Sequence, residues 1–203
     1  LEAEPFGSVE NHELFKKGYY HVQDLSSQLC CAALEPKKGE KILDICSAPG
    51  GKAFTITEMA GDECELYACE LHDKRVKLIK NGAERLGLKS IKALQNDAKV
   101  YNESFPKFDK ILCDVPCSGT GVIRSKPEIK YADLKKFEGL PKIQYDILST
   151  AAKYLKVGGE LVYSTCTVLK EENELVIEKF LKENKNFAGV SFLTDIGAPF
   201  EEY

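Results

Sequence analysis

Two cysteines stand in turns rich in Ser, Thr, Gly and Pro, each after a segment with the composition of a β-strand. Cys117 lies in DVPCSGTG, residues 114–121, and Cys166 lies in STCT, residues 164–167. Neither cysteine has a second ligand at metal-binding spacing, so a structural zinc site is not expected. A thiolate is a strong nucleophile that can add to C6 of a cytosine or uracil ring. Two thiols at one edge of a sheet would therefore indicate nucleophilic catalysis on a pyrimidine.

A second group of residues indicates an adenosine-containing ligand. The turn SAPGGK, residues 47–52, allows close backbone approach and opens a helix whose N-terminus favours an anion. It matches neither the dinucleotide fingerprint nor the P-loop. Glu70 is placed to accept hydrogen bonds from ribose hydroxyls, and Asp97 to accept one from the adenine amine. A ligand with a carboxylate and without a long phosphate chain is expected, and S-adenosylmethionine fits this description.

Alternating strand-like and helix-like segments must position these residues. Short apolar runs predict strands over 40–46, 64–71, 90–97, 107–116 and 160–166. Helices, the second preceded by the Gly-rich turn, are predicted over 23–36, 47–61, 72–88, 140–159 and 170–184. Asp24 or Ser26 would cap the first helix, and glycines would close the fourth. This order predicts an α/β, Rossmann-like fold with a mostly parallel sheet flanked by helices, which binds ligands at the carboxyl ends of its strands.

The composition narrows the class of protein. The chain has 203 residues, 43% of them hydrophobic, and no apolar run of membrane-spanning length, so we expect one domain and no membrane span. Eight cysteines without a Cys-x-x-Cys pair are typical of a reducing, cytoplasmic protein. The net charge of -4 argues against strong nonspecific nucleic-acid binding by this chain alone.

Three segments carry a specific resemblance to a known family. DICSAPGGK, DVPCSGTGVIRSKPEIK and YSTCTVLKEEN resemble the signature segments of the Sun family of RNA cytosine-C5 methyltransferases, and YHVQDLSSQ extends the similarity towards the start. Within that family, the resemblance is strongest to members acting on bacterial 16S ribosomal RNA. It implies that residues 1–203 form a class I methyltransferase catalytic domain. This domain would use S-adenosylmethionine to methylate cytosine C5 in RNA, with ribosomal RNA as the expected substrate.

The resemblance also implies roles for individual residues. Cys166 would be the nucleophile on C6, and Cys117 would assist release of the product. Asp114 would hydrogen-bond the cytosine edge, and Lys52 would help to position it. The methyl donor would be held by Cys46, Ser47, Ala48, Pro49, Gly50, Gly51, Lys52, Glu70, Arg75, Asp97 and Asp114. No metal is implied. Phosphate contacts would come from Arg124, Lys126 and Lys130.

The sequence also departs from the family pattern and leaves alternatives open. The N-terminal RNA-binding portion of longer members is expected to be absent. Residues 189–193, GVSFL, would supply one C-terminal strand, with the last strand truncated. A tRNA cytosine-C5 methyltransferase is the nearest alternative. A DNA enzyme would use the Pro-Cys thiol as its nucleophile and would not need Cys166. A noncatalytic RNA-assembly module is the alternative from a different class.

Overall fold

A five-stranded sheet organises residues 8–190, the part of the chain that the computed structural model describes. The strand order is β3–β2–β1–β4–β5, and all four pairings are parallel. The strands are β1 (Lys41–Asp44), β2 (Glu65–Glu70), β3 (Ile91–Gln95), β4 (Phe108–Asp114) and β5 (Leu155–Ser164). The predicted Rossmann-like class is confirmed. The order reverses between β1 and β4, which is where such sheets bind ligands.

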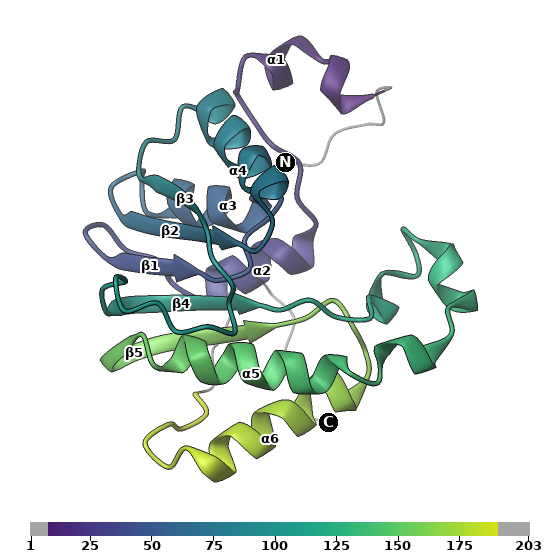
Figure 1. Ribbon diagram of the computed structural model, residues 1–203. Helices are drawn as coiled ribbons and strands as arrows, with labels where there is room; N and C mark the ends of the chain where they lie inside the picture. The colour runs from purple at the N-terminus through teal and green to yellow at the C-terminus, as the bar shows by residue number, and fades with distance from the viewer. Residues whose placement is uncertain (1–7, 191–203) are drawn as a thin grey trace.

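Helices cover both faces of this sheet (Figure 1). One face carries α2 (Leu25–Ala33), α3 (Gly51–Met59) and α4 (Asp73–Leu86), and the other carries α5 (Leu140–Ala152) and α6 (Glu174–Glu183). Near the N-terminus, the short η1 (Val9–Asn11) and α1 (Glu13–Lys16) precede α2. The segment between β4 and α5 projects from the body and contains η2 (Thr120–Val122), η3 (Pro127–Tyr131) and η4 (Leu134–Phe137). A further short helix, η5 (Lys170–Glu172), precedes α6.

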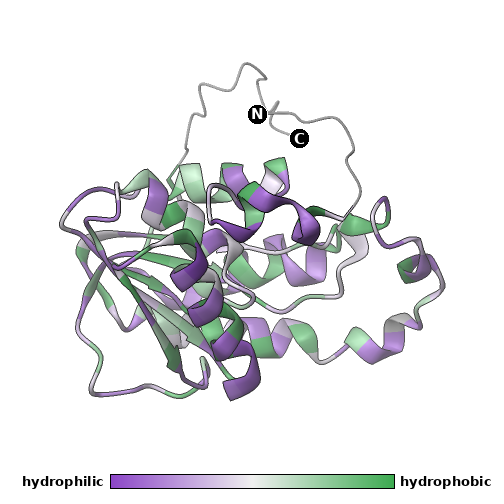
Figure 2. Ribbon diagram, turned by 90° about the horizontal axis from the view of Figure 1, so that it is seen from above, coloured by the Kyte–Doolittle hydropathy of each residue, from purple (hydrophilic) through white to green (hydrophobic). Residues whose placement is uncertain are grey.

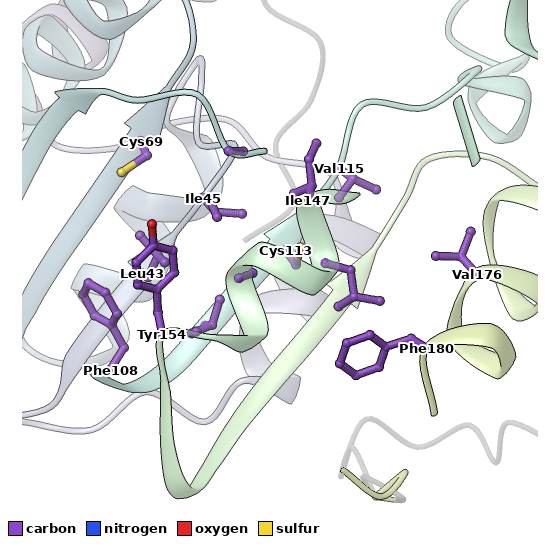
Figure 3. Close-up of a cluster of buried hydrophobic side chains, with 14 residues drawn as sticks. Leu43, Ile45, Cys69, Phe108, Cys113, Val115, Ile147, Tyr154, Val176 and Phe180 are labelled. Carbon is purple, nitrogen blue, oxygen red and sulfur yellow. The ribbon is translucent and has the colours of Figure 1, made fainter. Parts of the chain in front are cut away.

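The sheet separates two hydrophobic cores. Successive residues of a strand point to opposite faces, so Ile42 packs beneath α3 and α4 while Leu43 faces the α5 side. On the α5 side, Figure 3 shows Phe108 and Tyr154 close to Leu43, and all three are fully buried. Burial on both faces explains why the central strands read as short continuous apolar runs.

The helical periodicity of α4 matches its burial. Val76, Ile79 and Ala83 are buried as their spacing predicts, while the charged residues between them face outward. Figure 2 shows the same division of hydrophobic and hydrophilic positions along the helices. Gly87 ends α4 in the left-handed conformation, with φ of 72°, which a glycine adopts without steric cost.

The structure corrects the predicted end of the fourth helix. α5 ends at Ala152, and the segment from Leu155 to Gly159, predicted as helix, is the first half of β5. Gly158 has a φ of 78°, and a Cβ on Gly159 would lie 2.7 Å from the Asp109 carbonyl oxygen. Gly159 therefore allows a close approach between β4 and β5, and Gly158 supplies a left-handed backbone conformation; neither marks a helix end.

Two smaller expectations also have outcomes. Asp24 occupies the position before α2, as one of the two predicted caps, but its side chain makes no capping hydrogen bond. The strand predicted over 189–193 extends beyond the described residues. No helix within residues 8–190 is both long and apolar enough to cross a membrane.

Candidate active site

A cleft of about 790 Å³ opens at the carboxyl edge of the sheet, where the strand order reverses. Its walls come from the segments that follow all five strands and from α2. Most of the residues that the sequence singled out line it together: Cys46, Ala48, Lys52, Glu70, Arg75, Asp97, Asp114, Cys117 and Cys166. The structure thus brings to one place side chains from residue 46 to residue 166 of the sequence.

The other four predicted residues form the turn beneath the cleft instead of its wall. They are Ser47, Pro49, Gly50 and Gly51. The Ser47 N–H donates to the Cys69 carbonyl at 2.8 Å, which ties the turn to the end of β2. Because α3 begins at Gly51, its first N–H groups have no intrahelical partners and can receive a carboxylate.

Glu70 is a buried acid at the end of β2, with a side chain only 6% exposed. Arg75 Nη1 lies 3.1 Å from Glu70 Oε2. Arg75 Nη2 donates to the Ala48 carbonyl at 2.8 Å. The His72 N–H donates to Oε1 at 3.1 Å. A carboxylate has about four acceptor positions, so Glu70 retains capacity for ribose hydroxyls. Arg75 thereby holds both the acid and the glycine turn.

Asp97 lies two residues beyond the end of β3. Its Oδ1 accepts the Lys99 N–H at 2.9 Å, a local turn contact that fixes the side chain. Among the described residues, no hydrogen bond or ion pair engages its Oδ2. The carboxylate therefore has an acceptor free at the wall of the cleft.

Asp114 and Lys52 form the charged centre of the site. Lys52 Nζ donates to Asp114 Oδ2 at 2.7 Å, and Ser164 Oγ donates to Oδ1 at 2.7 Å. Burial by itself lowers the pKa of Lys52, but the charge and hydrogen bond of Asp114 outweigh it and raise that pKa. Lys52 therefore stays protonated and fixes the carboxylate in the cleft.

The two thiols of the opening motifs meet in this cleft. Cys117 Sγ lies 2.9 Å from Cys166 Sγ, and the Cys166 N–H donates to Cys117 Sγ at 3.1 Å. Both cysteines are free. The hydrogen bond from Cys117 lowers the pKa of Cys166 to about 7, although burial opposes the shift. The same bond, together with burial, raises the pKa of Cys117. Of the two, Cys166 is the one poised as a thiolate.

Sequence reasoning missed two buried acids near this site. Glu172 is 1% exposed and was hidden in a run of charged residues that resembles a solvated helix start. Asp44 ends β1 with no exposed surface, and burial raises its pKa to about 7. An acid inside the apolar run ILDIC was the available signal for Asp44.

No metal centre accompanies these groups. Across residues 8–190, no group of three or more His, Cys, Asp or Glu side chains is arranged to hold a metal ion.

The parallel sheet, its strand order and the cleft at its switch point define the class I methyltransferase fold. A methyltransferase homolog protein from Pyrococcus horikoshii superimposes with a TM-score of 0.77 at 32% identity, over 89% of this chain and 56% of that one. NSun6 from the same organism, solved with SFG, gives a TM-score of 0.81 at 35% identity, over 88% and 46% of the two chains.

The chain belongs to the 16S rRNA methyltransferase RsmB/F family, whose model matches residues 31–198. The probable ribosomal RNA small subunit methyltransferase B of Bacillus subtilis is 44% identical over 184 residues. That alignment covers 89% of this chain and 41% of the relative. The Salmonella arizonae enzyme of the same name is 42% identical over 91% of this chain and 42% of its own length. The chain thus spans about two fifths of the curated relatives that it matches.

Proposed function

We propose that this chain is the catalytic domain of an RNA methyltransferase that places a methyl group on C5 of cytosine. The observation that carries the proposal is the pair of sulfurs, Cys117 and Cys166, 2.9 Å apart in the cleft at the sheet's switch point. An exposed thiol of lowered pKa is the nucleophile that addition to a pyrimidine C6 requires. Membership of the RsmB/F family supports this activity.

The donor side of the cleft fits S-adenosylmethionine. Glu70 offers a buried carboxylate for ribose hydroxyls, Asp97 offers an acceptor for the adenine amine, and the start of α3 offers N–H donors for the amino-acid carboxylate. The Pyrococcus NSun6 structure contains SFG, an analogue of this donor. When bound, S-adenosylmethionine supplies the methyl group.

The residues of the acceptor side account for the remaining steps. The Cys166 thiolate adds to C6, forming a carbon–sulfur bond and making C5 electron-rich. Asp114, held by Lys52 and Ser164, hydrogen-bonds the cytosine edge and favours this charge development. After methylation, a base takes the C5 proton, the bond between Cys166 and C6 breaks, and the thiolate leaves. Cys117, which donates to the departing sulfur, assists this elimination.

The expected substrate is 16S ribosomal RNA, because the Bacillus subtilis and Salmonella arizonae relatives are both named as methyltransferases of the small-subunit ribosomal RNA. A tRNA would use the same chemistry and remains the second candidate. We place the reaction in the cytoplasm, where ribosomal RNA is modified, and assign residues 1–203 to one catalytic domain. Arg124, Lys126 and Lys130 are exposed on the segment between β4 and α5, whose Gly121 and Val122 line the cleft, and they are the proposed phosphate contacts.

Covalent trapping tests the catalytic proposal. On RNA containing 5-fluorocytosine, the C5 fluorine cannot leave as a proton, so a catalyst stalls as a protein–RNA adduct visible on denaturing gels. We expect the adduct with the wild type and none with Cys166→Ala. Cys117→Ala should accumulate an adduct on unmodified RNA, because addition proceeds while elimination stalls. Cys64→Ala, which changes a half-buried cysteine far from the cleft, is the control.

Two outcomes would contradict this assignment. An adduct from Cys166→Ala with none from Cys117→Ala would make Cys117 the nucleophile, as in a DNA-type enzyme. Binding of S-adenosylmethionine in calorimetry without any adduct or methylation, on ribosomal and transfer RNA alike, would favour the noncatalytic RNA-assembly module. Comparing the two RNA classes in the same assay decides between the two substrates.

A further inference from the structure

Glu172 is a buried carboxylate that lies outside the cleft and takes no part in the steps above. It is the last residue of η5, on the loop that joins β5 to α6. A buried carboxylate is costly unless hydrogen bonds replace its hydration. The groups that satisfy Glu172 are all neutral donors. Their positions in the chain indicate what this residue does.

The three donors come from both cysteine-bearing loops and from α5. The Ser118 N–H, next to Cys117, donates to Oε2 at 2.9 Å. Thr167 Oγ1, next to Cys166, donates to Oε1 at 3.3 Å. Gln144 Nε2 donates to Oε2 at 2.7 Å and also to the Pro116 carbonyl at 3.0 Å. One side chain therefore joins the residue that follows each cysteine.

Hydroxyl contacts extend this bridge around Thr167. Its Oγ1 lies 2.8 Å from Ser118 Oγ and 2.7 Å from Thr120 Oγ1. The two loops start from β4 and β5, which are neighbouring parallel strands about 4.8 Å apart. Cys117 lies three residues beyond the end of β4 and Cys166 two residues beyond the end of β5, so the strand spacing does not by itself set the distance between their sulfurs. The Gly121 N–H ties the two loops directly by donating to the Cys166 carbonyl at 3.0 Å, and Glu172 with its donors adds a second, side-chain connection between them.

We propose that Glu172 is a positioning residue, which holds the Cys117 and Cys166 loops so that their sulfurs stay within hydrogen-bond distance. The catalytic value of this positioning rests on the proposed function, whereas the contacts of Glu172 with the two loops do not depend on it. Glu172 touches neither sulfur. It acts through Ser118 on one loop and Thr167 on the other. Without it, the side-chain bridge would be lost and only direct contacts, such as that of the Gly121 N–H with the Cys166 carbonyl, would hold the two loops, so we expect Cys117 to donate to Cys166 less often.

Glu172→Gln tests the bridge, because it keeps the size of the side chain and replaces one acceptor oxygen with a donor that faces other donors. Two measurements report the sulfur geometry without RNA or methyl donor. The first is the rate at which diamide joins the two thiols, which form a disulfide while the reagent takes up their protons and electrons. The second is the pH midpoint of Cys166 alkylation, followed by mass spectrometry of its peptide.

We expect Glu172→Gln to slow disulfide formation by about tenfold or more. The alkylation midpoint should move up towards about 8.5, the value of an ordinary thiol. In the methylation assay kcat should fall, while KM for S-adenosylmethionine stays near the wild-type value. Glu171→Gln, the same change at the exposed neighbour, should leave all values as in the wild type.

The proposal would be overturned if a natively folded Glu172→Gln variant formed the disulfide at the wild-type rate and kept the wild-type pH midpoint of Cys166 alkylation. If that variant does not fold, Thr167→Val removes the link on the Cys166 side with little change of shape, and the same values decide. A wild-type protein that never methylates RNA would refute the proposed function alone, because the two thiol measurements still judge the positioning.

Discussion

Cysteine is used in two different ways within this chain. Burial raises the pKa of Cys31 and Cys69 to about 12, so these thiols act as small apolar groups in the two cores. Cys166 is at the cleft, and the hydrogen bond from Cys117 lowers its pKa to about 7. Reactivity therefore depends on one neighbouring sulfur and is not a property of the residue type.

The first prediction follows from that neighbour. At pH 7, iodoacetamide should label Cys166 faster than any other cysteine of residues 8–190, with a rate that rises as pH passes through about 7. In Cys117→Ala the principal cause of the lowered pKa is gone, so the midpoint of the rate should move to higher pH. Peptide mass spectrometry across a pH series measures both. An unchanged midpoint would show that Cys117 does not stabilise the thiolate.

The second prediction concerns Asp44, which is fully buried and has Ser47 and the Cys46 backbone as polar neighbours. Burial raises its pKa to about 7 in the folded state, against about 3.9 unfolded. Between these values the folded state binds the extra proton, so the free energy of unfolding falls as pH rises. Relative to Asp44→Asn, the wild type should lose about 2–3 kcal/mol between pH 5 and pH 8.

Urea unfolding of the wild type and Asp44→Asn at both pH values measures this difference. The variant supplies the control, because every other titrating group is shared and cancels. Parallel pH dependence of the two proteins would show that Asp44 is already ionised at pH 5 in the folded state.

Single residues differ in how far the sequence reveals them. Glu70 and Asp114 were predictable because each ends an apolar run, and parallel strands bring such ends together. Glu172 was not, since its burial depends on Ser118, Gln144 and Thr167, contacts that only the fold creates. The run of charged residues around Glu172 reads as a solvated surface whether Glu172 is buried or exposed.

At the scale of elements, periodicity sufficed where local and tertiary preferences agree. The strands and α4 follow from their patterns. The boundary between α5 and β5 could not be predicted from the pattern, because Gly158 and Gly159 in the sequence suggest the end of a helix. Gly159 instead lies against the Asp109 carbonyl, where the register between β4 and β5 shifts.

The third prediction tests the turn between β1 and α3. Gly50 has a φ of 112°, and an added Cβ would lie 2.4 Å from Cζ of the buried Phe54 ring. Gly50→Ala should therefore destabilise the fold by about 1–3 kcal/mol, from backbone strain and overpacking together. Gly51 has an ordinary φ and no atom closer than 3.7 Å, so Gly51→Ala should leave stability unchanged or slightly higher.

Chemical unfolding of the two alanine variants beside the wild type makes this comparison. The positions are adjacent and the added methyl group is the same, so only the local geometry differs. Equal losses at both positions would mean that neither the left-handed conformation nor the Phe54 contact constrains the turn.

At the scale of the whole molecule, charge is distributed unevenly around a net value of -4. The carboxyl edge of the sheet combines the acids of the donor site with a projecting segment that carries exposed Arg124, Lys126 and Lys130. An acidic chain with one basic projection should bind RNA weakly overall. Its contacts should be concentrated beside the cysteine cleft, where a target nucleotide must enter.

The last prediction measures how much of the RNA affinity this projection supplies. Single-stranded RNA binding should weaken steeply with salt, and each phosphate contact contributes about 0.7 to the slope of log K against log salt. Replacing Arg124, Lys126 and Lys130 by alanine should therefore lower the magnitude of that slope by about 2. Filter binding between low and physiological salt gives the slope for each protein.

The matched control removes three exposed lysines, Lys37, Lys38 and Lys156, which lie before β1 and near the start of β5, at the opposite edge of the sheet. It changes the net charge by the same amount, so any effect of overall charge appears in both triple variants. If the projection holds the RNA, only the first variant loses slope. Equal losses would show that RNA responds to net charge and that the segment between β4 and α5 is not its contact surface.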